Sequence, residues 1–367
     1  MPRPGGSARR ARIFPIMARI AVIPGDGIGT EVTRQAVKLL RLFAAEAQLP
    51  LELVEWDLGT ERYLRTGSAI TTEEMEDLRS NYDAILLGAL GDPRVPDNRH
   101  TREILLGLRF HLDLYVNLRP VRLFDAALSP LRDVKPEDVD IVIVRENTEG
   151  VYTGMGGNFK RGTPDEIAIE EDVNTRKGVE RIVRAAFEHA RAAGRHKVTL
   201  ADKANAMPHA GDLWRRVFAE VAAEYPDIEH QASYIDALAL DLVLHPARYD
   251  VIVTSNLFGD ILSDLAAALV GGLGLAPSAN LHPGRHAMFE PVHGSAPDIA
   301  GTGRANPLAA ILTTALMLDH LGYAREAARV DAVVRRAIAE RRTTPDLGGS
   351  LTTDQVGDWI CEAIRET

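Results

Sequence analysis

The segment "DVIVTSNLFGDILSDL" (residues 250–265) joins two different patterns. Its first part, 250–256, is a short apolar run, as in a strand buried on both faces of a parallel sheet. Its second part has apolar residues at helical spacing and two acids, Asp260 and Asp264. Residues four apart share one face of a helix. The segment therefore predicts a buried strand followed by a helix with a carboxylate pair, and such a pair is costly unless positive charge lies beside it.

The same alternation of strand and helix extends along the chain. The clearest helix is expected within 174–194, with Asn174 or Thr175 as its cap and Gly194 at its end. The alternation predicts an α/β fold with a largely parallel sheet. Further strands are expected at 18–25, 83–90, 140–147 and 197–203.

Composition limits the possible functions. The chain has 367 residues, which suggests two domains or one large α/β unit, and a formal net charge of −10. An acidic chain is a poor partner for nucleic acid or an anionic membrane. Cys361 is the only cysteine, which excludes an intrachain disulfide or a cysteine-based metal site. The cytoplasm is the expected compartment, and the sequence contains no apolar run of about 18 residues that could span a membrane.

Two segments differ from the rest. Residues 1–16 are rich in Arg, Gly and Pro. We expect a mistaken start codon or a disordered leader, with a targeting arm as the alternative, and folding should begin near Met17. Residues 149–173 contain short β-like pieces between Gly and Pro turns. An excursion of this kind predicts an arm or a surface for a partner.

The acidic pair predicts a metal site. Apolar residues surround Asp260 and Asp264, so the carboxylates lie at the edge of a core, where like charges need neutralising. Asp236, at another junction of strand and helix, could complete the set. Oxygen ligands suit Mg²⁺ or Mn²⁺. The alternative is a set of solvated acids on helix surfaces.

Three arginines near strand ends predict an acid-binding clamp. Arg109, Arg119 and Arg145 lie in or beside apolar runs, where a guanidinium group must be paired or face a ligand. The guanidinium fork matches carboxylate geometry, so a di- or tricarboxylate is one expected ligand and structural ion pairs are the alternative. Tyr152 and Lys203, also at strand ends, are candidates for proton transfer.

A glycine-rich loop at 289–307 is a candidate nucleotide site. It carries His293, Asp298 and Asn306, and backbone N–H groups with a carboxylate can hold phosphate and ribose. An ordinary surface loop is the alternative. The glycines of "PGDGIG" (24–29) do not have the G-x-G-x-x-G spacing, so we expect a tight turn there and no Rossmann fingerprint.

Six stretches occur together in one order: "IAVIPGDGIGTEV", "LDLYVNLRPV", "VRENTEGVYTG", "DKANA", "TSNLFGDILSDLAAALVGGLG" and "EPVHGSAPDIAG". From about residue 18 to 360, the chain resembles the β-decarboxylating dehydrogenases. The resemblance implies two α/β domains around a mixed, largely parallel sheet that is not a Rossmann fold. One domain would comprise 17–114 and 271–367, and the other 115–270. The second would carry a dimerisation arm, and the active sites would be shared between two subunits.

The resemblance also implies roles for the candidate residues. In the family's pattern, the arginines hold the carboxylates of a malate, Tyr152 protonates an enolate, and Lys203 of the partner subunit helps to remove a hydroxyl proton. Asp260 and Asp264 bind the metal together with the partner's Asp236. Residues that match the NAD-binding loop are His293, Gly294, Ser295, Ala296, Pro297, Asp298 and Asn306.

The implied reaction is the NAD- and metal-dependent oxidative decarboxylation of a 3-substituted (R)-malate. Leu105 and Leu106 occupy the position that faces the substrate's γ-group in the family. An apolar pair there favours 3-isopropylmalate, the substrate in leucine biosynthesis. Three departures, Arg102 beside Glu103, Ala206 and the "RENTEGVYTG" motif, keep tartrate or D-malate as the alternative, followed by isocitrate or homoisocitrate. A non-catalytic regulatory subunit is disfavoured because the metal and proton-transfer residues are all present.

Overall fold

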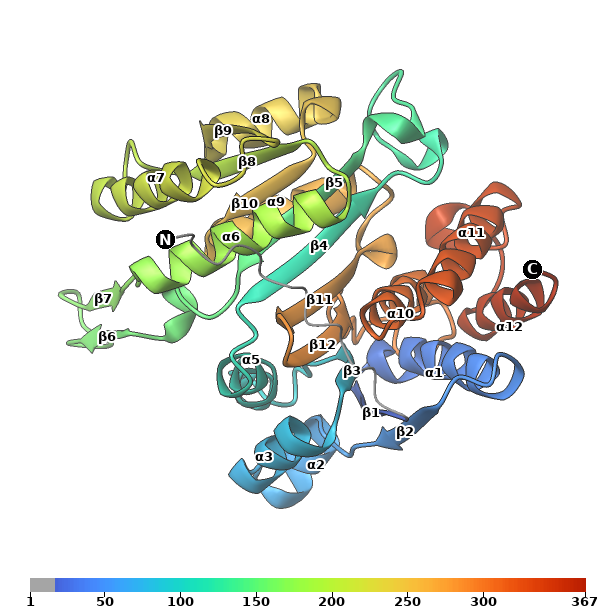
Figure 1. The fold of residues 1–367 in the computed structure, drawn as a ribbon. Coiled ribbons are helices and arrows are strands. Elements are labelled where there is room, and N and C mark those ends of the chain that lie inside the picture. Colours follow the sequence, from blue (N-terminus) through green and yellow to red (C-terminus); the bar gives the residue numbers. More distant parts are fainter. Residues whose placement is uncertain (1–16) are drawn as a thin grey trace, which may run out of the picture.

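A ten-stranded sheet runs through the molecule (Figure 1). The computed structural model describes residues 17–367, so the predicted leader lies outside the described residues. The strands lie side by side in the order β2-β1-β3-β12-β11-β4-β5-β10-β8-β9. Their bounds are β1 Ala18–Gly25, β2 Leu51–Glu55, β3 Ala84–Ala89, β4 Val116–Arg122, β5 Asp140–Glu146, β8 Lys197–Asp202, β9 Glu229–Tyr234, β10 Val251–Thr254, β11 Pro277–His282 and β12 His286–Pro291.

Most neighbouring strands of this sheet are parallel, which confirms the prediction of a mixed, largely parallel α/β fold. The antiparallel pairs are confined to its middle, where β11 pairs with β12 and β4, and β4 pairs with β5. A short turn joins β11 to β12, and two strands joined in this way must run in opposite directions. The sheet is therefore parallel in both outer parts and antiparallel where they meet.

Helices cover both faces of the sheet (Figure 1). α1, α10, α11 and α12 share one apolar core with β1, β3, β11 and β12, and α3 and α5 lie on the other face. In the other half, α6 and α7 cover one face, and α8 and α9 cover the other. The helix bounds are α1 Ile28–Glu46, α2 Thr60–Thr66, α3 Thr72–Asn81, α4 Arg99–Thr101, α5 Gly107–His111, α6 Arg176–Ala192, α7 Pro208–Ala222, α8 Ile235–Leu244, α9 Asn256–Ala268, α10 Leu308–His320, α11 Ala324–Ala339 and α12 Thr353–Arg365.

Local signals in the sequence explain where these elements begin and end. The Thr175 hydroxyl accepts a hydrogen bond from the Gly178 N–H and so caps α6, as predicted. The "PGDGIG" segment forms the predicted tight turn between β1 and α1. Gly27 has a φ of 53°, and a Cβ atom there would lie 2.1 Å from the Ser295 carbonyl oxygen. This glycine thus lets the loop at 289–307 pack directly against the start of α1.

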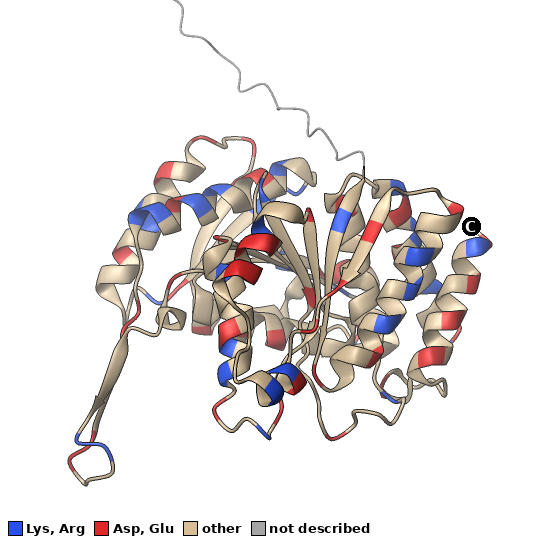
Figure 2. Ribbon diagram, turned by 90° about the horizontal axis from the view of Figure 1, so that it is seen from below, with Lys and Arg blue, Asp and Glu red and all other residues tan. Residues whose placement is uncertain are grey.

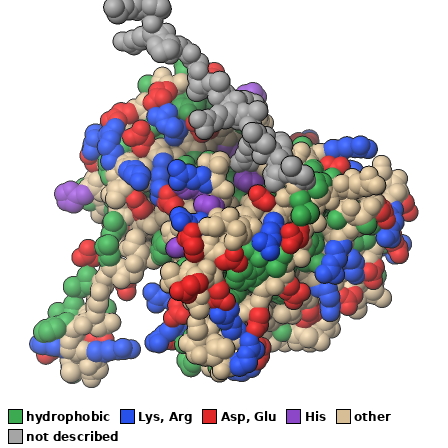
Figure 3. Space-filling view, turned by 60° about the horizontal axis from the view of Figure 1, so that its bottom comes forward, with side chains coloured by type: hydrophobic (Ala, Val, Ile, Leu, Met, Phe, Trp, Pro, Cys, Tyr) green, Lys and Arg blue, Asp and Glu red, His purple; other side chains and the backbone are tan. Residues whose placement is uncertain are grey.

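The excursion at 149–173 forms a hairpin, here called the arm, from β6 (Gly156–Phe159) and β7 (Ile167–Glu170). Both of its strands are exposed along their whole length. Figure 2 shows the arm extending away from the body, and Figure 3 shows hydrophobic side chains along it. Among residues 17–367, no helix combines the length and the apolar character needed to cross a membrane.

Candidate active site

The predicted arginines line one pocket of about 230 Å³. It lies where the two halves of the sheet meet, over β11, β12, β4 and β5. Its wall comprises Leu87, Gly88, Ala89, Leu90, Thr101, Leu105, Leu106, Arg109, Arg119, Arg145, Tyr152, Asp260, Ser278, Glu290, Pro291, Val292, His293 and Gly294. A separate cavity of about 290 Å³ is lined by Pro120, Arg122 and apolar residues of α10 and α11, and it contains none of the predicted site residues.

The three arginines come from different elements but are all buried: Arg109 from α5, Arg119 from β4 and Arg145 from β5. Each contacts an acid. Arg109 Nη2 lies 2.8 Å from Glu290, and Arg145 Nη1 lies 2.6 Å from Asp260. The structure thus contains the ion pairs of the alternative interpretation, and because the arginines also line a pocket, binding of an acid stays a prediction. Arg109 Nε is buried without a hydrogen-bond partner among the described residues.

Burial decides the electrostatics of this cluster. It lowers the pKa of Arg145 to about 9, aided by the nearby charges of Arg119 and Arg109. Burial also lowers the pKa of Arg119. Three cations this close together favour anionic ligands, because each added negative charge relieves their mutual repulsion. The pocket can therefore hold an acid with more than one carboxylate.

Of the carboxylate pair of α9, Asp260 lines the same pocket and Asp264 does not. Asp260 Oδ2 accepts a 2.7 Å hydrogen bond from the Tyr152 hydroxyl, and Arg119 lies 3.3 Å from Asp260 and 3.7 Å from Asp264. Burial alone would raise the pKa of Asp260, but Arg145 and Arg119 together outweigh it and keep the net pKa low. In Asp264, burial is the larger effect and raises the pKa. The positive charge that the acidic pair requires is supplied within the chain by these arginines.

Gly259 explains how α9 approaches so closely. A Cβ atom at this position would lie 2.5 Å from Arg145 Cγ. Any larger residue would push the arginine stem away from the helix and so displace its guanidinium group. The glycine before Asp260 thus permits the contact between Arg145 and the acidic pair.

Tyr152 is suited to hold a proton. It lies in a 3-10 turn directly after the strand and loop that carry Arg145, and the guanidinium group of Arg145 is 5.2 Å from its ring centre. Burial, followed by the hydrogen bond to Asp260, raises the pKa of Tyr152. The phenol therefore remains protonated at neutral pH and can act as an acid.

Lys203 and Asp236 are not in this pocket. They form their own pair instead, with Lys203 Nζ 2.5 Å from Asp236 Oδ1. The hydrogen bond from Lys203 is the main reason that the pKa of Asp236 is lowered. Residues 17–367 contain no group of three His, Cys, Asp or Glu side chains placed to hold a metal ion. One chain therefore presents two possible metal ligands, Asp260 and Asp264, without the third that Asp236 was expected to add.

The predicted nucleotide loop lies beside the pocket, between β12 and α10. His293 and Gly294 reach its wall, while Asp298 is exposed. Burial lowers the pKa of His293, and its Nε2 atom is buried with no partner in the described part of the chain. A neutral ring with an unused nitrogen suits a ligand that offers a hydrogen bond. Asn306 is already engaged, since its amide donates to Asp346.

Part of the apolar wall comes from a single π-helical turn, Arg102–Leu106, between α4 and α5. Leu105 and Leu106 both reach the pocket from this turn. Turns of this kind occur often at functional sites. Arg102 and Glu103, in the same turn, are exposed.

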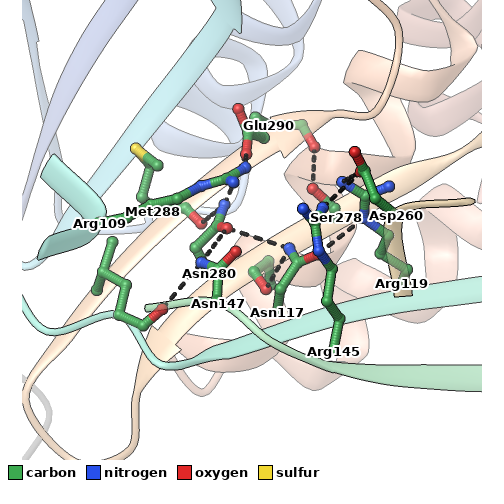
Figure 4. A network of polar contacts seen from close by, with 12 residues as sticks. Arg109, Asn117, Arg119, Arg145, Asn147, Asp260, Ser278, Asn280, Met288 and Glu290 are labelled. Atoms are coloured by element: carbon green, nitrogen blue, oxygen red, sulfur yellow. Dashed lines mark hydrogen bonds and ion pairs between the residues drawn. The ribbon is translucent and has the colours of Figure 1, made fainter. Parts of the chain in front are cut away.

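The polar residues that hydrogen-bond to Arg109 and Arg119, and to each other, were not predicted from the sequence (Figure 4). Arg119 Nε donates to Asn117, and Asn117 donates to Asn280. Asn280 in turn donates to Glu290, the partner of Arg109. One signal could have indicated Asn117, because it lies two residues before Arg119 and so shares the same strand face.

Buried arginines and carboxylates around a pocket between two halves of one sheet define an enzyme that acts on small carboxylic acids. The family described as "Isocitrate/isopropylmalate dehydrogenase" matches residues 19–360, so the chain belongs to this family of oxidoreductases. It is 51% identical to 3-isopropylmalate dehydrogenase from Thermobifida fusca, over 95% of this chain and 98% of that protein. It is also 51% identical to the enzyme of that name from Streptomyces griseus, over 94% of this chain and 97% of that protein.

Solved structures agree with the family. Isocitrate dehydrogenase from Methylococcus capsulatus is 40% identical, with a TM-score of 0.86 over 95% of this chain and all of that one. A β-decarboxylating dehydrogenase from Thermococcus kodakarensis is 39% identical, with a TM-score of 0.78 over 95% of this chain and 97% of that one. The predicted fold class and enzyme family are therefore confirmed.

Proposed function

We propose that this chain oxidises and decarboxylates 3-isopropylmalate to 4-methyl-2-oxopentanoate and CO₂ in leucine biosynthesis, with NAD and Mg²⁺ or Mn²⁺. The observation that carries this proposal is the pocket that Leu105 and Leu106 line together with three buried arginines. The curated relatives at about half identity, with this name, support the same substrate. We propose the cytoplasm as its location.

The charged groups at the pocket and Tyr152 then have specific roles. Arg109, Arg119 and Arg145 bind the two carboxylates, and Tyr152 holds the proton that goes to the enolate carbon. Asp260 and Asp264 supply carboxylate oxygens, the donors that Mg²⁺ and Mn²⁺ prefer. When bound, the cation lowers the pKa of the substrate hydroxyl and stabilises the enolate charge, and NAD accepts the hydride.

The third carboxylate and the lysine come from a second subunit in this proposal. The partner subunit's Asp236 would complete the metal ligands, and the partner subunit's Lys203 would accept the hydroxyl proton. The pairing of Lys203 with Asp236 supports this, because the two residues lie together and outside the chain's own pocket.

Exposed apolar side chains support a homodimer. They occur on α8 and α9, which pack together, and on the arm. Large apolar groups grouped in this way mark a surface that a partner covers. The groups are Leu240, Leu244, Leu257, Ile261, Met155, Phe159, Ile167 and Ile169.

We also propose the two-domain division, with 17–114 and 271–367 in the first domain and 115–270 in the second. The buried cores support it, since three of them draw all their members from one side of this division. In the remaining core, Phe124 is the exception among the buried members, and partly buried Leu118 and Leu128 of the second domain also pack against it.

A substrate panel tests the proposed function. Transfer of the isopropyl group into a pocket with Leu105 and Leu106 gains about 0.8 kcal/mol per carbon, or roughly 2.4 kcal/mol. We therefore expect kcat/KM for 3-isopropylmalate to exceed that for D-malate by about 60-fold. Equal turnover of D-malate or tartrate would favour the alternative function. A preference for isocitrate or homoisocitrate would assign the chain to another branch of the family, and inactivity on the whole panel would indicate a non-catalytic subunit.

Cofactor choice depends on the exposed carboxylate of Asp298. In the proposed site it accepts hydrogen bonds from the adenosine ribose and repels the 2′-phosphate of NADP. We expect kcat/KM to be much higher with NAD than with NADP, and Asp298→Asn should narrow the gap. A preference for NADP in the unchanged enzyme would contradict this role. His293, Gly294, Ser295, Ala296, Pro297 and Asn306 complete the proposed NAD site.

A further inference from the structure

A row of directly paired residues crosses the middle of the sheet on its cleft face. Asn280 of β11 lies opposite Asn117 of β4, which lies opposite Arg145 of β5. On its other side, Asn280 lies opposite Met288 of β12. Asn280 and Asn117 are both fully buried. Two buried side-chain amides are costly unless hydrogen bonds satisfy them. The hydrogen-bond partners of Asn117 and Asn280 therefore indicate which groups these two residues position.

Asn280 connects both halves of the arginine clamp (Figure 4). Its Oδ1 atom accepts from Asn117 Nδ2 at 3.1 Å and from Asn147 Nδ2 at 3.0 Å. Its Nδ2 atom donates to Glu290 Oε1 at 2.9 Å. Only one orientation of the amide serves these partners, because the two amide groups donate and the carboxylate accepts. The side chain is therefore fixed in both position and direction.

The two ends of this network are substrate-binding groups. Glu290 Oε1 accepts from Arg109 Nη2 at 2.8 Å, and Asn117 Oδ1 accepts from Arg119 Nε at 2.7 Å. We propose that Asn280 is a positioning residue that sets the separation of the Arg109 and Arg119 guanidinium groups, and so selects the acid that the clamp accepts. The proposal rests on the function proposed above, and no contact between Asn280 and substrate is required.

The expected effect follows from what the clamp does. The carboxylates held by Arg109 and Arg119 are present in both the substrate and the transition state. A misplaced clamp therefore weakens binding of both, which raises KM more than it lowers kcat. A defect that only destabilised the fold would lower the melting temperature and the fraction of active enzyme, and it would not raise KM more than it lowers kcat.

The isosteric variant Asn280→Asp is the sharpest test. We expect KM for the acid to rise about tenfold with kcat within about threefold of the parent. The introduced carboxyl group would face Glu290, which is paired with Arg109. His282 lies two residues further along β11 and contacts Asp113. Arg119 lies on the other side of Asn117. When protonated it can donate to Glu290 as the amide does, whereas two ionised carboxylates repel. The KM penalty should thus be smaller at low pH, where the introduced carboxyl group is protonated, than at high pH.

Asn280→Leu and Asn81→Asp complete the experiment. The leucine variant removes the hydrogen bonds without adding charge, so its KM should rise by a similar factor that does not change with pH. Asn81→Asp makes the same amide-to-acid change at the exposed end of α3 and should leave KM unchanged. Calorimetric titration of each variant with the acid measures affinity without turnover. Unchanged KM and affinity in both Asn280 variants would overturn the proposal, whereas a parent enzyme that prefers another acid would overturn only the proposed substrate.

Discussion

Asp260→Asn should lower kcat/KM by about a thousandfold, the largest effect expected from a single carboxylate in this pocket. The change removes one proposed metal ligand. It also removes the negative charge that faces Arg145 at 2.6 Å and Arg119 at 3.3 Å. Tyr152 loses the carboxylate that accepts the hydrogen bond from its hydroxyl group. Binding, metal affinity and proton transfer therefore weaken together.

A metal titration distinguishes the loss of a metal ligand in Asp260→Asn from a general loss of structure. Titration with Mn²⁺ should show affinity in the parent enzyme and little in the Asp260→Asn variant. EDTA should abolish the parent's activity, and Mn²⁺ or Mg²⁺ should restore it. Asp358→Asn, which removes an exposed acid of α12, is the matched control and should change neither quantity. Full activity of Asp260→Asn without added metal would contradict the assignment.

Lys203→Met should lower kcat by about a thousandfold while Mn²⁺ binding persists. The lysine is proposed to accept the substrate's hydroxyl proton, and methionine keeps most of the side-chain volume without the amine. Lys38→Met is the matched control, because Lys38 forms an exposed pair with Asp358 at the same 2.5 Å as Lys203 with Asp236. An active Lys203→Met enzyme would remove the lysine from the mechanism.

Residues near strand ends were predictable because local pattern places them. Arg119, Arg145 and Asp260 lie in or directly after apolar runs, so each was expected in or beside a buried strand. In the structure all three line one pocket. Leu105 and Leu106 were placed by resemblance, and the structure adds the π-helical turn that brings both leucines to the pocket.

Asn280 and Glu290 could not be found in this way. Their strands mix polar and apolar residues, and their role depends on the antiparallel register of β11 with β12 and β4. Register is set by pairing between distant segments, which a single sequence does not display. The positions of Lys203 and Asp236 were uncertain for a related reason, because one chain does not show which pocket they complete.

The shared active site is the central claim, and a mixed dimer tests it most directly. Lys203→Met and Asp260→Asn subunits are co-expressed with different tags, and the doubly tagged dimer is purified. In the site built on the Lys203→Met subunit, the metal ligands are intact and the partner subunit supplies a normal lysine. The opposite site carries both lesions. If lysine acts across the interface, the mixed dimer should recover about half of the parent's activity, although each homodimer is nearly inactive. If Lys203 acts within its own chain, every site keeps one lesion, and a mixed dimer as inactive as the two homodimers would contradict the account.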